Sequence, residues 1–136
     1  MEDIKKTDHR ESGYFRHKLP PESIAMLDGG SVPKGKIYVY LSEKENIDLA
    51  CPQYPIVQSY VDICMNGCLE IEGEYRLAKE KGFAKSFIKT TTCWSEHWVN
   101  DRIYPRRPFI YVPRALAIDE LLDKYIPEYF DKIKIE

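Results

Sequence analysis

The amino-acid sequence predicts an α+β fold, with a small sheet of about three strands covered on one face by one long and one shorter helix. Apolar residues recur at spacings of three and four over roughly residues 55–81, which indicates a long helix. Short runs rich in β-branched and aromatic residues, such as 37–41, indicate strands. With 43% hydrophobic and 12% aromatic residues among 136, the chain has enough apolar material for a core, which excludes global disorder.

We expect residues 1–18 to form a mobile N-terminal arm and residues 19–136 to form a single α+β domain. Acidic and basic residues alternate in the arm without a helical or strand period. Its few large apolar residues are Ile4, Tyr14 and Phe15. Pro20 and Pro21 end the arm, and Pro21 suits the first turn of a short helix.

The middle of the chain predicts a strand and then the long helix. Residues 37–41 are apolar on both faces, which is typical of a central strand. The long helix has one apolar seam, and Gly82 fits its C-terminal cap. The seam consists of Val57, Val61, Cys64, Cys68, Ile71, Tyr75 and Ala78. Gly67 and Gly73 lie inside the helix, each at a cost of about 1 kcal/mol relative to alanine, so the helix either departs from a straight course or permits another element to approach closely.

The last third of the chain predicts two further strands and the shorter helix. Phenylalanine, isoleucine and three threonines favour a strand within 83–93, and residues 94–100 form a helical turn. A third short strand covers 109–112. From Arg114 the apolar spacing predicts a helix that Pro127 breaks.

Charge and composition exclude some classes of protein. The net charge of −2 argues against a dedicated nonspecific DNA binder, although a local basic patch remains open. No stretch approaches the roughly 18 apolar residues that span a bilayer, so we expect no membrane partner. The polar N-terminus has no apolar signal core, which predicts a cytoplasmic, reducing location and cysteines that are thiols or ligands.

The segment from Cys93 to Arg114 is the strongest candidate for a functional site. It holds both tryptophans and four of the seven arginines, and its part from Arg102 to Arg114 has no acidic residue. Guanidinium groups offer paired donors to phosphate or carboxylate, and aromatic rings provide stacking faces. The segment therefore predicts a binding module for an anionic ligand: a nucleotide, a nucleic-acid strand or another phosphorylated partner. The expected ligand-binding residues are Arg102, Arg106, Arg107, Arg114, Trp94, Trp98 and Tyr104.

Several alternatives remain open at this stage. The arginines also suit ion pairs with the acidic C-terminal segment, which has six acids and three lysines over residues 115–136. Arg, Trp and Tyr dominate protein interfaces, so the chain also fits a structural or regulatory subunit, including one that self-associates.

Cysteine and histidine chemistry gives two weaker hypotheses. Cys93 and His97 suit a small thiol enzyme, because a neighbouring base ionises a thiol. Cys64, Cys68, Cys93 and His97 form a possible zinc set, but they lack the tight CxxC spacing, and buried thiols explain the first two. No cofactor is therefore predicted, with zinc as the remaining possibility.

Overall fold

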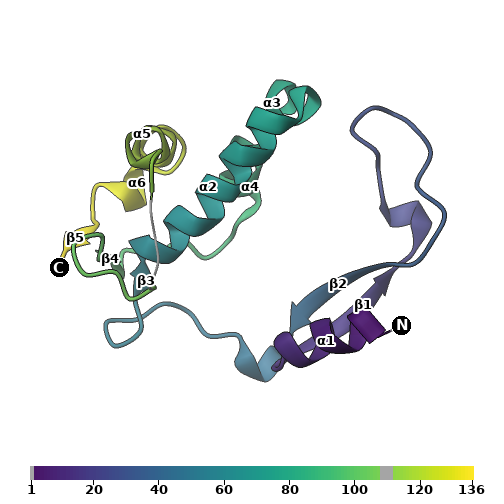
Figure 1. The fold of residues 1–136 in the computed structure, drawn as a ribbon. Coiled ribbons are helices and arrows are strands. Elements are labelled where there is room, and N and C mark those ends of the chain that lie inside the picture. The colour runs from purple at the N-terminus through teal and green to yellow at the C-terminus, as the bar shows by residue number, and fades with distance from the viewer. Residues whose placement is uncertain (1, 108–111) are drawn as a thin grey trace. The chain divides into compact units, whose positions relative to one another are not determined.

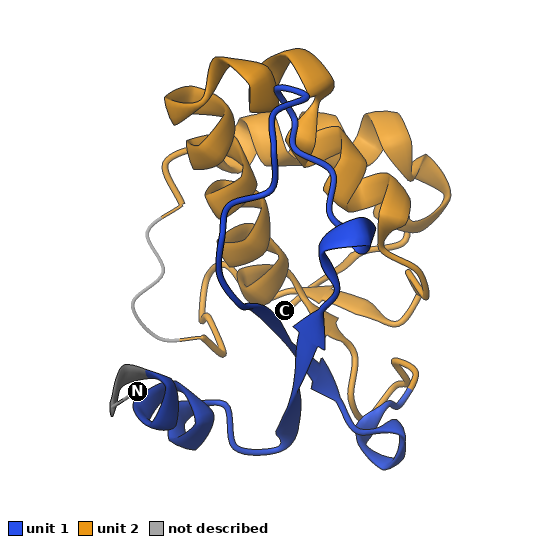
Figure 2. Ribbon diagram, turned by 90° about the vertical axis from the view of Figure 1, so that its right-hand side faces the viewer, with its two compact units in different colours: residues 1–48 blue, residues 49–136 orange. Residues whose placement is uncertain are grey.

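The computed structural model describes residues 2–107 and 112–136 and has an α+β fold (Figure 1). The chain divides into two compact units, Met1–Asp48 and Leu49–Glu136 (Figure 2). This boundary differs from the one expected after residue 18, and the mobility of residues 1–18 stays a prediction. No helix in the described ranges is long and apolar enough to cross a membrane.

The first unit consists of a helix followed by an antiparallel hairpin. Its elements are α1 (Glu2–Arg10), β1 (Tyr14–Leu19), η1 (Pro21–Ser23), β2 (Ile37–Ser42) and η2 (Lys44–Asn46). Asp8 joins α1 to both strands, because it accepts hydrogen bonds from Arg16 at 2.8 Å and from the Tyr40 hydroxyl at 2.7 Å. This carboxylate raises the pKa of Tyr40, chiefly through the hydrogen bond that the neutral phenol donates.

Two expectations for this unit need correction. Residues 1–18 were expected to have neither helical nor strand structure, yet they contain α1 and all of β1 except its last residue, Leu19. The strand expected at 37–41 is confirmed as β2, but it lies in a two-stranded sheet and is not central. Its hydrogen-bonding partner is β1, in a register that runs from Tyr14 opposite Ser42 to Leu19 opposite Ile37.

The second unit contains three short parallel strands in the order β3-β4-β5. Its elements are β3 (Ile56–Val57), α2 (Gln58–Glu74), α3 (Arg76–Lys81), α4 (Phe83–Thr90), β4 (Trp98–Asn100), α5 (Ala115–Tyr125), α6 (Pro127–Phe130) and β5 (Lys134–Ile135). Parallel neighbours need a crossover connection. Helices α2 to α4 provide it between β3 and β4, and α5 with α6 between β4 and β5 (Figure 1).

The core of the second unit lies where α2, α4 and α5 pack together beside β4. Each helix contributes a row of apolar residues at spacings of three or four, which places them on one face. The buried cluster consists of Val61, Met65, Cys68, Ala84, Ile88, Trp98, Ile118, Leu122 and Ile126. The rows meet because Gly82 reverses the chain between α3 and α4.

The long helix is shorter than the spacing predicted, and a different set of its residues faces the core. It stops at Glu74, because Tyr75 has an extended backbone (φ −119°, ψ 106°), and α3 then continues to Lys81. Met65 is buried, whereas Ile71 and Tyr75, expected in the seam, are 38% and 61% exposed. The helix thus has a second apolar face that points away from the core.

The strand expected within 83–93 is wrong, because Phe83–Thr90 is α4. Thr90 and Thr91 donate their hydroxyl hydrogen bonds to the carbonyl oxygens of Ser86 and Phe87, four residues earlier, which adapts β-branched residues to the end of a helix.

The helical turn expected at 94–100 is also wrong, because residues 94–97 contain no helix and Trp98–Asn100 forms β4. The strand expected at 109–112 lies outside the described residues, apart from Val112. The helix expected from Arg114 to the break at Pro127 is confirmed by α5, which starts at Ala115.

Gly82 provides the first test. Its φ of +67° lies in the left-handed region, and its amide caps α3 while its carbonyl accepts the first bond of α4 from Ser86. We expect Gly82→Ala to lower the free energy of unfolding by about 1 kcal/mol, because a Cβ disfavours this backbone conformation. Urea unfolding followed by tryptophan fluorescence measures this unit, since both tryptophans lie in it. An unchanged free energy of unfolding would contradict the claim that a residue with a Cβ is strained at this cap.

Candidate functional site

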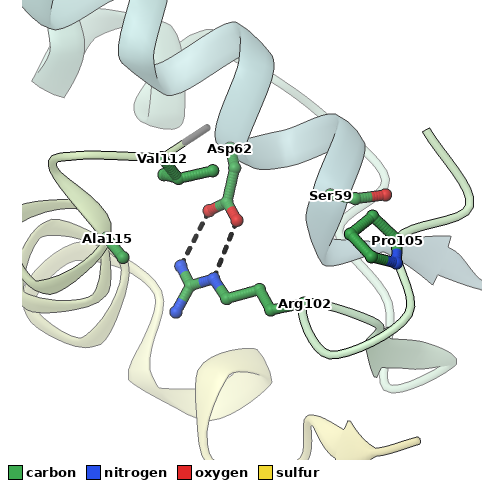
Figure 3. Close-up of a pocket in the computed structure, with 6 residues that line it drawn as sticks. All are labelled: Ser59, Asp62, Arg102, Pro105, Val112 and Ala115. Carbon is green, nitrogen blue, oxygen red and sulfur yellow. Dashed lines mark hydrogen bonds and ion pairs between the residues drawn. The ribbon is translucent and has the colours of Figure 1, made fainter. Parts of the chain in front are cut away.

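A cavity of about 210 Å³ lies at the carboxyl ends of β3 and β4 (Figure 3). Ligands of open parallel sheets bind at this edge, so its position alone makes the cavity a candidate site. Its walls come from the start of α2, the segment after β4 and the start of α5. The lining residues are Ser59, Asp62, Arg102, Pro105, Val112 and Ala115.

The polar wall of the cavity is a carboxylate–guanidinium network that joins these three elements. Arg102 follows β4 and binds two carboxylates side by side, Asp62 of α2 and Asp119 of α5, at 2.7–2.8 Å. Figure 3 shows the two parallel bonds between Arg102 and Asp62. Gln58 donates a further bond of 2.8 Å to Asp62 from one turn earlier in α2. The network therefore connects both crossover connections of the sheet.

The guanidinium of Arg102 is already paired on two sides, with one carboxylate on each. The four hydrogen bonds of Arg102 use four of the five N–H groups of a guanidinium. Asp62, chiefly through these hydrogen bonds, raises the pKa of Arg102 above its ordinary value. Asp62 has no exposed side-chain surface, so its charge depends on Arg102. Arg102 is consequently fixed as a structural cation and has little capacity left for a ligand.

Asp101, the residue before Arg102, organises the same edge of the sheet. It is buried, and its carboxylate accepts hydrogen bonds from the backbone N–H and hydroxyl of Ser59 and from the backbone N–H of Arg106, at 2.7–2.8 Å. The residue before α2, Val57, has no side chain that can cap the helix. Asp101 therefore takes the role of an N-terminal cap from a distant part of the chain.

The other three arginines of the predicted site point to separate partners. Arg106 binds Glu136, with one bond of 2.7 Å. Arg114 donates to Asn66 at 2.8 Å and lies 3.6 Å from Glu70. Arg107 stacks over the ring of Tyr60 at 4.9 Å and has no carboxylate partner among residues 2–107 and 112–136. The structure thus disperses the arginines that the sequence grouped together.

The aromatic residues of the predicted site do not share one location either. Trp94 and Trp98 stack on each other, with ring centroids 5.2 Å apart, and Trp98 is 1% exposed. The Trp94 indole donates its N–H to the Ile88 carbonyl, which fixes the ring against α4. Tyr104, by contrast, is 83% exposed. The tryptophans therefore serve the core, and Tyr104 alone presents an open aromatic face.

The cysteine and histidine candidates show no catalytic or metal-binding geometry. Cys93 is exposed and has a positive φ of 64°, and no hydrogen bond joins it to His97 in the described part of the chain. Cys64 and Cys68 lie in α2, where burial raises the pKa of both thiols. The described residues contain no group of three or more His, Cys, Asp or Glu arranged to hold a metal ion. The zinc and thiol-enzyme hypotheses gain no support.

A second concavity, of about 440 Å³, lies at the opposite, amino ends of β4 and β5. We call it the basic hollow, and it is lined by Glu96, His97, Lys132 and Lys134. Its only ion pair in the described ranges, Lys132 with Glu96, is long at 3.6 Å and solvent-exposed. No pattern in the sequence predicted this site. Its only local signal is the alternation of Lys132 and Lys134 around an apolar residue.

Comparison of the chain with protein families, with curated proteins and with solved structures gives no match. The functional argument therefore depends on the geometry of the two sites described above.

The network around Arg102 gives the second prediction. We expect Arg102→Met to lower the free energy of unfolding by about 3–5 kcal/mol, because Asp62 would remain buried without its cation. The double variant Asp62→Leu/Arg102→Met should lose less than the sum of the two single variants, with a coupling of about 1–3 kcal/mol. Urea unfolding of all four proteins measures the cycle. Additive losses would mean that the two side chains do not stabilise each other.

Asp101 gives the third prediction. Burial opposes its charge, but the hydrogen bonds from Arg106 and Ser59 outweigh this and lower its pKa. A lowered pKa stabilises the fold above the unfolded value, about 3.9, and this gain disappears as pH falls through the folded value.

We therefore expect Asp101→Asn to cost about 2 kcal/mol at pH 7 and progressively less below pH 4. Urea midpoints of the variant and the unaltered protein at pH 7, 4 and 2.5 test this. Asp131→Asn, which changes an exposed acid, is the matched control. A difference that stays constant with pH would rule out the ionised carboxylate as the cap.

Proposed function

We propose that the second unit is a binding module for a small anionic ligand, and that the ligand binds in the basic hollow. Two lysines, one histidine and one acidic side chain line this concavity, an excess of one positive charge with histidine counted as neutral, although the whole chain has a net charge of −2 on the same count. That local excess of positive charge is the observation that carries the proposal. It retains the anionic ligand expected from the sequence and moves its site from the arginine segment to the amino ends of β4 and β5.

The backbone around the hollow supports a defined arrangement of the basic residues. The carbonyl of His97 accepts a hydrogen bond of 2.9 Å from Ile56, which holds the start of β4 against β3. Lys134 lies opposite Val99 in the β4–β5 ladder. Ile133, between the two lysines, packs against the core, and both lysines line the hollow. The ligand would therefore meet side chains that start from fixed positions.

The charges in the hollow are available to a ligand. The pair between Lys132 and Glu96 is 3.6 Å long, and both side chains are more than half exposed, so it contributes little stability. The ammonium group of Lys134 and the imidazole of His97 have no ion-pair or hydrogen-bond partner among the described residues. This contrasts with Arg102 and Arg106, whose guanidinium groups already bind carboxylates. An anion would replace only the weak contact with Glu96.

The size and shape of the hollow favour a single phosphate or carboxylate group on a small molecule. Lysine ammonium groups bind phosphate as point charges, and about 440 Å³ falls within the usual range of small-molecule sites. A nucleic-acid strand would need a longer basic track than four residues provide. The proposal therefore specifies a phosphorylated or carboxylated small molecule.

Titration with inorganic phosphate tests the proposal. We expect dissociation in the millimolar range, with amide shifts in ¹H–¹⁵N spectra centred on residues 96–97 and 132–134, at constant ionic strength maintained with chloride. The variant Lys132→Gln/Lys134→Gln should weaken binding by about tenfold or more, which corresponds to 1.4 kcal/mol.

The matched control is Lys79→Gln/Lys81→Gln, which removes the same charge from two exposed lysines of α3. The control should bind phosphate like the unaltered protein. Equal weakening in both variants would reduce the effect to general electrostatics and overturn the proposal. Shifts confined to residues 102–107 would return the site to the arginine segment.

A further inference from the structure

Helix α2 has an apolar face that points away from its own core. We call it the outer face of α2; it consists of Tyr60, Ile63, Gly67 and Ile71, at spacings of three and four. Its three large side chains are 51%, 45% and 38% exposed. The opposite face of the same helix is buried through Val61, Met65 and Cys68. A helix of a monomeric unit normally exposes polar residues on its second face, so this pattern indicates a contact surface.

Gly67 lies at the centre of this face, and nothing in the described chain requires a glycine there. A Cβ added at this position would meet no atom within 4 Å. Glycine inside a helix is unfavourable relative to alanine because it loses more backbone entropy. Its advantage is that another backbone can approach closely. The position of Gly67 is therefore suited to a helix that crosses α2 at this point.

The outer face is symmetric about Gly67. Ile63 lies four residues before it and Ile71 four residues after it, while Tyr60 and Glu74 lie seven residues before and after. In an antiparallel crossing of two α2 helices at Gly67, Ile63 of one copy meets Ile71 of the other, twice. This arrangement is the self-complementary contact of a two-fold dimer.

The charges at the two ends of the face are complementary in the same arrangement. The Tyr60 end has the guanidinium of Arg107, which stacks on the Tyr60 ring and has no carboxylate partner among the described residues. The other end has Glu70 and Glu74 on an adjacent stripe. An antiparallel crossing places each Arg107 beside Glu74 of the second copy. A parallel crossing would bring like charges together, so the charges specify the antiparallel orientation.

We infer that a second copy of this chain covers the outer face of α2, and that the two α2 helices cross antiparallel at Gly67. The dimer joins two apolar faces with paired charges at both ends. Since it involves one helix from each copy, the contact is at the small end of protein interfaces, and we expect a monomer–dimer equilibrium at micromolar concentrations or above. The basic hollow contributes no residue to this contact.

Sedimentation equilibrium from about 5 µM to 1 mM tests the inference on the full chain, over the range typical of weak contacts. We expect the average mass to rise toward that of a dimer with concentration. Gly67→Gln should raise the dimer dissociation constant by at least about tenfold, because a long side chain at the crossing separates the helices, although glutamine is a better helix former. A mass that stays at the monomer value up to 1 mM would overturn the inference.

Gly73→Gln is the matched control on the same helix. It makes the same substitution at an exposed position about 120° around the helix from Gly67. Both variants should raise the urea midpoint of the chain, since both replace a helical glycine, yet only Gly67→Gln should weaken the dimer. If both variants dimerise like the unaltered protein, the crossing is not at Gly67 and the inference fails.

A charge exchange tests the antiparallel orientation. Arg107→Glu and Glu74→Arg should each raise the dimer dissociation constant several-fold, because each places like charges together at both ends. The double variant Glu74→Arg/Arg107→Glu should restore the dissociation constant to within about twofold. Single variants without effect, or a double variant as weak as their sum, would contradict this pairing.

Discussion

The second unit depends on one partly buried positive charge, the guanidinium of Arg102, and on the two carboxylates that pair with it. Asp62 has no access to water, so its charge is tolerable only beside a cation with matching geometry. Because Asp62 belongs to α2, Arg102 follows β4, and Asp119 belongs to α5, the same bonds that satisfy the charge also set the positions of these elements. The short strands, two or three residues each, provide few hydrogen bonds, and this network adds polar contacts between the sheet and the helices to those of the apolar core.

The need of buried carboxylates for hydrogen-bonding partners also explains the contacts that the segment after β4 makes. The loop after β4 carries Asp101 and Arg102 side by side, and each connects to α2, one through the Ser59 amide and one through Asp62. Arg106 extends this pattern, since its amide binds Asp101 while its side chain reaches Glu136 at the end of the chain. A segment rich in arginine and poor in acids can therefore be the complement of carboxylates located elsewhere in the fold.

The sequence predicted elements whose structure depends on local pattern. Helix α5, the left-handed cap at Gly82 and strand β2 follow from spacing, glycine and β-branched residues, and all three are present. Strand β4 could not be recognised, because three residues become a strand only through ladder partners at Ile56–Val57 and Lys134–Ile135. Helix α4 was missed because threonine and phenylalanine favour strands in general, whereas here the threonine hydroxyls bond to the preceding turn.

The partner that each basic residue has in the structure shows why the candidate site was harder to predict than the fold. The partners of Arg102, Arg106 and Arg114 lie 17 to 48 residues away in the sequence, so no local pattern reveals that these cations are already paired. Lys132 and Lys134 look ordinary in the sequence, yet the β4–β5 ladder brings them beside His97, with one distant acid. A charge is available to a ligand only if folding leaves it without a partner. The carboxyl ends of the strands use their charges internally, whereas Lys132 and Lys134 at the amino ends keep theirs exposed to solvent.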